Sequence, residues 1–116
     1  MTTSTCAKVI YWRAKPGQFD AYTDYLRTEV EPIDHAALER GVLTRFATLM
    51  DTRVDAPWTH MRIFEFADTA QRARLQQGLG AIMQEMLPDS HARAARALRA
   101  AGLRDKIGED DLDLLG

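Results

Sequence analysis

The sequence predicts an α+β domain built around an antiparallel sheet. Three patterns lead to this prediction: strand-forming residues near the start, two strand-like segments around a short polar loop, and apolar residues at helical spacing in the remaining segments. The chain has 116 residues, of which 46% are hydrophobic and 28% charged, and these values are typical of one folded domain. We therefore expect a single hydrophobic core.

The first predicted strand covers residues 6–14, after a short segment, residues 1–5, that we expect to be disordered. Both alternating faces of this strand carry large side chains, so we expect the sheet to be covered on both sides. Residues 15–17, Lys-Pro-Gly, predict the turn that ends it. The strongest strand formers in the segment are Val9, Ile10, Tyr11 and Trp12.

A helix is predicted from Gln18 onward. Pro32 has no amide donor, so we expect a kink near Glu31 and a second helical piece from Ile33 to Arg40 that stops at Gly41. The apolar positions that carry the helical spacing are Phe19, Tyr22, Leu26, Val30 and Ile33.

A hairpin is predicted in the middle of the chain. Residues 42–50 and 58–66 read as strands, and the polar loop at 51–57 is short enough to make them antiparallel neighbours. In the second of these strands one face carries Trp58, His60, Arg62, Phe64 and Phe66.

Helices are predicted for most of the remaining chain. Asp68 followed by Gln71 indicates a capped helix start, and Pro88 ends that helix. Residues 89–116 are predicted to form an Ala/Arg-rich helix and a mobile acidic tail. The resulting order β-α-β-β-α, over residues 6–88, is most of a ferredoxin-like unit.

Helices on one face of such a sheet leave the other face to be covered. If Ile10, Trp12, Phe64 and Phe66 point away from the helices, a monomer would expose them. We therefore expect a homodimer that packs sheet against sheet.

Two stretches resemble a known group of proteins. Residues 13–22, Arg-Ala-Lys-Pro-Gly-Gln-Phe-Asp-Ala-Tyr, resemble the opening of dimeric α/β-barrel proteins, including the NIPSNAP-like and antibiotic-biosynthesis-monooxygenase-like families. Residues 58–66, followed by Asp68 and Arg72, are similar to the NIPSNAP pattern, and the resemblance covers about residues 7–87. These families have a fourth strand, which here is either short, near residues 103–107, or replaced by helix.

This resemblance implies a dimeric α/β barrel and no cofactor, and the Ala/Arg-rich segment after Pro88 adds an extra C-terminal helix to it. It also implies one of two functions. We favour a NIPSNAP-like small-molecule-binding homodimer of unassigned activity. The alternative is a cofactor-independent enzyme, such as a monooxygenase, isomerase or cyclase, that acts on an aromatic or polyketide-like molecule.

A polar pair among aromatic residues is the candidate site. His60 and Arg62 share a strand face, and such a pair can orient a small acidic or phenolic ligand. His60 is the candidate catalytic base, with an unperturbed pKa of about 6.5 that a nearby Arg62 would lower. We expect His60→Ala to abolish activity or binding without unfolding the protein. The competing interpretation is that Arg62 pairs with a carboxylate across the dimer interface and His60 caps a strand edge.

The other candidate ligand-binding residues are mainly aromatic. A small apolar or aromatic ligand is expected to contact them, although aromatic residues at this spacing are also typical of a core. The predicted ligand-binding set is Trp12, Tyr22, Tyr25, Trp58, Arg62 and Phe64.

Several other classes of function are disfavoured. Glu31, His35 and Glu39 share helical spacing, but they are better explained as a solvated charged stripe than as metal ligands. Cys6 is the only cysteine, which excludes an internal disulfide. The chain has 15 basic and 17 acidic residues, a balance that argues against binding to nucleic acid or anionic membrane. No targeting segment and no apolar run of about 18 residues is evident, so we expect a cytoplasmic protein.

Overall fold

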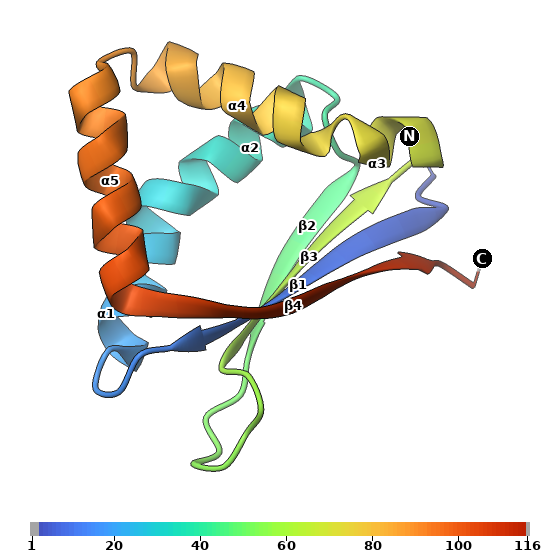
Figure 1. The fold of residues 1–116 in the computed structure, drawn as a ribbon. Helices are drawn as coiled ribbons and strands as arrows, with labels where there is room; N and C mark the ends of the chain where they lie inside the picture. Colours follow the sequence, from blue (N-terminus) through green and yellow to red (C-terminus); the bar gives the residue numbers. More distant parts are fainter. Residues whose placement is uncertain (1–2, 116) are drawn as a thin grey trace.

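The structure is a computed structural model that describes residues 3–115. It contains a four-stranded antiparallel sheet in the order β2-β3-β1-β4, with helices packed on one of its faces (Figure 1). This confirms the predicted α+β class and the ferredoxin-like fold. The strands are β1 (Cys6–Ala14), β2 (Arg45–Met50), β3 (His60–Phe66) and β4 (Arg104–Asp113).

The last strand is the largest difference from the sequence-based expectation. The sequence predicts a mobile acidic tail at residues 108–113 and leaves open a short strand near residues 103–107, but residues 104–113 form one strand that pairs with β1, from Ala14↔Arg104 to Cys6↔Asp113. Acidic side chains on β4 flank Lys8 of β1, whose Nζ lies 2.9 Å from a carboxylate oxygen of Asp111 and 3.1 Å from one of Glu109. Pairing with β1, rather than intrinsic strand propensity, therefore makes this segment a strand.

The helical segment after β1 is continuous but changes its pitch. It consists of α1 (Phe19–Tyr25), a turn of π-helix, η1 (Leu26–Val30), and α2 (Glu31–Glu39). The π turn comes just before Pro32, which cannot donate the usual backbone hydrogen bond, so the predicted kink is absorbed within a continuous helix. Gly41 follows with a φ of 71°, the left-handed conformation expected of a helix stop.

Three more helices follow β3. They are α3 (Thr69–Ala73), α4 (Leu75–Met86) and α5 (Ser90–Leu103). Asp68 caps α3 by accepting a hydrogen bond from the Gln71 backbone N–H at 2.7 Å, as its sequence predicts. In Figure 1, α4 crosses above the sheet and α5 descends beside it, so that with α2 they surround one face.

The sheet has a covered face and an open face, and their assignment corrects one expectation. Ile10, Phe64 and Phe66 are buried in the core beneath the helices, and Trp12 packs against them. These four residues therefore belong to the covered face rather than to a dimer surface. Alternation then places on the open face Val9, Tyr11, Leu49, Met61 and Ile63.

The N-terminal segment is partly ordered. Residues 1 and 2 of the predicted disordered segment 1–5 lie outside the described residues. Thr5 donates a backbone hydrogen bond to Phe66 and accepts one from Leu114, so it is tied to both β3 and the end of β4. Within residues 3–115, none of the helices has the length and apolar character that a bilayer crossing requires.

Candidate functional site

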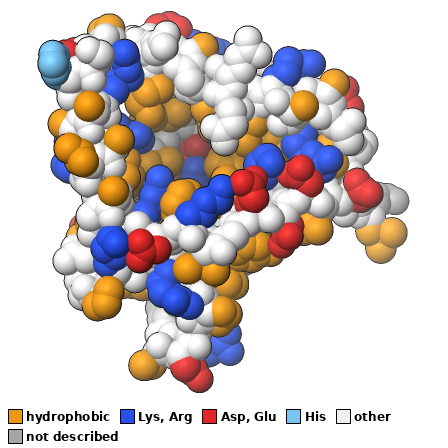
Figure 2. Space-filling model, in the orientation of Figure 1, with side chains coloured by type: hydrophobic (Ala, Val, Ile, Leu, Met, Phe, Trp, Pro, Cys, Tyr) orange, Lys and Arg blue, Asp and Glu red, His pale blue; other side chains and the backbone are white. Residues whose placement is uncertain are grey.

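A cavity of about 300 Å³ lies between the covered face and the helices, and we call it the central cavity. Figure 2 shows the molecule hollowed between α4, α5 and β4. The volume is at the lower end of the usual range for small-molecule sites, about 300–1,000 Å³. Its walls are mainly apolar and aromatic: Ile10, Trp12, Tyr25, Val30, Ile33, Phe64, Leu79 and Met83.

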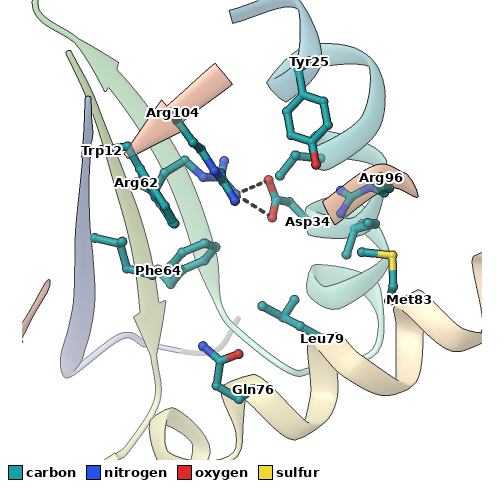
Figure 3. A pocket seen from close by; sticks show the side chains of 13 residues that line it. Trp12, Tyr25, Asp34, Arg62, Phe64, Gln76, Leu79, Met83, Arg96 and Arg104 are labelled. Atoms are coloured by element: carbon teal, nitrogen blue, oxygen red, sulfur yellow. Dashed lines mark hydrogen bonds and ion pairs between the residues drawn. The ribbon is translucent and has the colours of Figure 1, made fainter. Parts of the chain in front are cut away.

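A buried ion pair stands in this cavity. One guanidinium nitrogen of Arg62, Nη2, donates to both carboxylate oxygens of Asp34, at 2.8 and 2.7 Å (Figure 3). Asp34 comes from α2 and Arg62 from β3, and only 2% and 4% of their surfaces are exposed. A second nitrogen of Arg62, Nη1, donates to the Thr48 hydroxyl at 2.9 Å. The partner of Arg62 is thus a carboxylate of its own chain.

Burial and the ion pair act in opposite directions on the pKa of Asp34. Burial raises the pKa of the Asp34 carboxyl above its usual range, and the Arg62 guanidinium offsets part of that rise. A carboxyl with a raised pKa inside a cavity is a group that can exchange a proton with a ligand.

Two further arginines line the central cavity. The guanidinium carbon of Arg104 lies 3.7 Å from the centre of the Trp12 ring, and its Nη1 donates to the Tyr22 hydroxyl at 3.0 Å. The guanidinium carbon of Arg96, on α5, lies 5.3 Å from the centre of the Tyr25 ring. Contact with aromatic rings holds both planar cations in place.

His60 lies outside the central cavity. It has no exposed surface, its ring packs against Phe19 and Tyr22, and it borders a separate cavity of about 170 Å³ that also contacts Thr23 and Met50. This complete burial argues against the expectation that His60→Ala leaves the fold intact.

Both ring nitrogens of His60 already have partners. Thr23 Oγ1 donates to the Phe19 carbonyl and lies 2.9 Å from Nε2, so it accepts a hydrogen bond from Nε2–H. Thr59 Oγ1 accepts from the Ala14 N–H and lies 2.8 Å from Nδ1, to which it donates. Burial lowers the pKa of His60 to about 4, so the ring is neutral near pH 7; burial, and not Arg62 as expected, causes this shift.

The predicted ligand-binding residues separate into two groups. Trp12, Tyr25, Arg62 and Phe64 all line the central cavity. Tyr22 is fully buried behind it, in contact with Arg104. The sixth, Trp58, contacts Tyr11, with ring centres 6.2 Å apart, and so lies on the open face.

Sequence analysis missed Asp34, Arg96 and Arg104. Asp34 had a detectable signal, because it follows Leu26 and Val30 at four-residue spacing and so falls within the apolar stripe of its helix. Arg104 had none, since its position depends on a strand that the local sequence does not predict.

The charged stripe on α2 carries no metal site. Within residues 3–115, no three His, Cys, Asp or Glu side chains are placed to hold a metal ion. His35 is exposed and stacks edge-on against Phe46, with ring centres 5.1 Å apart. Cys6 is a free, buried thiol in the core.

Comparison with known proteins shows the fold. No protein-family model and no curated protein matches the chain. A solved protein of unknown function from Nitrosomonas europaea is 24% identical, with a TM-score of 0.65 over 100% of this chain and 94% of that one. A dimeric ferredoxin-like protein from an uncultured marine organism is 9% identical, with a TM-score of 0.68 over 99% and 91%.

A third similar structure is a dabb family protein with a ferredoxin-like fold from Mesorhizobium loti. It is 18% identical to this chain, with a TM-score of 0.63 over 98% of this chain and 100% of that one. The chain therefore has a ferredoxin-like fold. Identities this low show the fold and not the activity.

Proposed function

We propose that this protein binds a small molecule in the central cavity. The observation that carries the proposal is the convergence of Trp12, Tyr25, Arg62 and Phe64 on one cavity from three different elements. Apolar walls around a few placed polar groups are the usual composition of a small-molecule site. Tyr22, Trp58 and His60 do not line the cavity, so we do not expect them to contact the ligand.

The two tryptophans allow a direct test. Trp12 lines the cavity and Trp58 lies on the open face, so Trp58→Phe leaves one reporter inside and Trp12→Phe leaves one outside. We expect 3-phenylpropionate and octanoate to change the fluorescence of the Trp58→Phe protein in a saturable way and to leave the Trp12→Phe protein unchanged. Equal responses from the two variants, or none, would contradict binding in the central cavity.

A homodimer through the open face is the second part of the proposal. The apolar side chains of Met61 and Ile63 are only half-buried in one chain, and Leu49 is 44% exposed. A second copy would cover them, and the similar marine protein is described as dimeric. Light scattering should give twice the 13.1 kDa chain mass, and Ile63→Lys should restore a monomer. A monomer in the unsubstituted protein would contradict this.

Within the ferredoxin-like fold we propose a NIPSNAP-like relationship over a monooxygenase-like one. The support is the sequence pattern at residues 58–66, with Asp68 capping the helix that follows. This relationship is compatible with a binding protein that has no assigned activity.

A cofactor-independent enzyme is the second candidate function, and Asp34 is the observation that favours it. Its carboxyl faces the cavity with a raised pKa, so it is a better candidate acid–base group there than His60. An enzyme of this kind should accelerate hydrogen–deuterium exchange at the acidic C–H groups of phenylacetone in D₂O, and Asp34→Asn should abolish the acceleration. Exchange at the uncatalysed rate would contradict the enzymatic function and leave binding as the only proposed function.

A further inference from the structure

A second hollow, which we call the outer hollow, shares part of its lining with the central cavity. This outer hollow, of about 320 Å³, is lined by Trp12, Tyr25, Arg96 and Arg104, all of which also line the central cavity, together with small residues of α5. Arg96 and Arg104 therefore stand where the two spaces meet. A ligand in either space can therefore reach both arginines.

The charges at this junction are not balanced by the protein. Within residues 3–115, Arg62 pairs with Asp34 and Arg99 pairs with Glu29, whereas Arg96 and Arg104 form no ion pair. Arg96 Nη2 donates to the Glu29 carbonyl at 3.2 Å, and Arg104 Nη1 donates to the Tyr22 hydroxyl at 3.0 Å. Each partner is neutral, so two positive charges remain uncompensated.

Both guanidinium groups are also half-buried and held by aromatic rings. A cation that is partly removed from water and fixed in orientation loses little further freedom when it binds an anion. In Figure 3, Arg96 and Arg104 come from different segments of the chain, and the apolar side chains of Phe64, Leu79 and Met83 line the same cavity. Cationic and apolar side chains thus border one space.

We propose that the ligand is a carboxylic acid with an aromatic or aliphatic body, whose carboxylate binds between Arg96 and Arg104. Its body fills the apolar part of the central cavity. This inference rests on the proposed binding function and specifies the ligand class. Neither arginine was a candidate from the sequence, and the Asp34–Arg62 pair takes no part in recognising the carboxylate.

The test uses matched acids and amides of the same size. 3-Phenylpropionate and 3-phenylpropionamide differ in charge and hardly in shape, and binding to the full chain can be followed by NMR titration of backbone amides. We expect the acid to bind at least tenfold more tightly than the amide at pH 7 and low salt, with shifts at Trp12 and Phe64 for both probes. Added salt should weaken the binding of the acid and leave the binding of the amide unchanged.

Substitutions assign the preference to particular residues. Arg96→Gln should reduce the preference for the acid to threefold or less, and Arg104→Gln should have the same effect. Arg99→Gln, on the same helix but paired outside the cavity, should leave the preference unchanged. Arg104 also donates a hydrogen bond to Tyr22, so Arg104→Gln could unfold the protein. In that case Arg104→Lys, which retains the charge, serves as the second variant.

The outcomes distinguish failure of the carboxylate inference from failure of the proposed small-molecule binding. Equal affinity for acid and amide, with shifts at Trp12 and Phe64, would overturn the carboxylate inference and leave the binding function standing. A preference that survives both Arg96→Gln and Arg104→Gln would also overturn it. Absence of cavity shifts with either probe would overturn the proposed function itself.

Discussion

The two faces of the sheet differ in how their polar and apolar residues are placed. On β3, the covered face presents His60 and Arg62, both buried, whereas the open face presents Met61 and Ile63, both half-exposed. A buried polar group costs free energy unless it has partners, and within residues 3–115 every buried side-chain nitrogen and oxygen has one. The covered face therefore holds a fully bonded polar network beside a cavity, and the open face holds an unsealed apolar surface.

This difference separates two roles within one strand. The covered face keeps polar groups in fixed positions, which suits recognition of a small molecule. The open face presents half-exposed apolar side chains beside the Arg45–Glu65 ion pair, a composition compatible with contact to another copy of the chain. If the two faces have these separate roles, substitutions on them should differ in their effect on stability.

The largest effect is expected from removing one member of the buried ion pair. Asp34→Ala leaves the Arg62 guanidinium buried without its counter-ion, and this should lower the free energy of unfolding by about 3–5 kcal/mol. Urea denaturation measures the change. The matched control is Asp34→Leu combined with Arg62→Met, which removes both charges and should cost much less. If the single variant is as stable as the unsubstituted protein, the polar network of the covered face is not a structural element.

His60 should make stability depend on pH. The pKa of His60 is about 4 in the folded protein and about 6.5 in the unfolded chain, so the unfolded state binds the proton first as the pH falls. The stabilisation is complete above pH 6.5 and is lost as the pH falls toward 4, a total of about 3 kcal/mol.

The pH effect can be isolated by comparing substituted proteins. His60→Gln should remove this component from a plot of unfolding free energy against pH, whereas His35→Gln, at an exposed position, should leave it in place. Parallel plots for the His60→Gln and unsubstituted proteins would show that His60 is not held neutral. Because His60 is buried, we also expect its replacement to reduce stability at pH 7.

The smallest effect is expected on the open face. Ile63 is half-exposed in one chain, so Ile63→Ala should lower the unfolding free energy by about 1 kcal/mol in dilute solution, less than for a fully buried isoleucine. If a second copy covers this face, the loss should grow with protein concentration. Denaturation at two concentrations measures this, and a loss independent of concentration would count against the dimer.

Some features of the fold were readable from local sequence. Helical spacing located the segments that became α1, α2, α4 and α5, and the Pro and Gly residues marked where they change or stop. The short polar loop predicted the pairing of β2 with β3. These features depend on neighbouring residues, which is why one sequence is sufficient to find them.

The sequence predicted only part of the candidate site. Strand alternation placed Arg62 and Phe64 on one strand face, and these two residues line one cavity together with Trp12, a candidate from the first strand. The same alternation put Trp58 there, but the strand starts at His60 and Trp58 contacts Tyr11 instead. Alternation applies only within a regular strand, so it does not extend to residues before it.

The roles of His60 and Arg62 were decided by partners far away in the sequence. Arg62 is neutralised by Asp34 of α2, and His60 is held by Thr23 of α1. Each partner lies on a separate helix whose rotation about its axis is set by the π turn and by packing. Local spacing places Asp34 on the apolar stripe of its helix, but it does not identify Arg62 as the partner, because that contact depends on packing against β3.

The sequence by itself determined the α+β class, the antiparallel hairpin and the approximate positions of the helices, because these follow from spacing and turn chemistry. Only the tertiary structure decided which face the helices cover and that residues 104–113 form a strand. The reason is that β4 has little strand propensity and is stabilised by its hydrogen bonds to β1, and by Lys8, across a separation of about a hundred residues. That strand also delivers Arg104 to the cavity, so the recognition of an acid depends on a contact that no local pattern predicts.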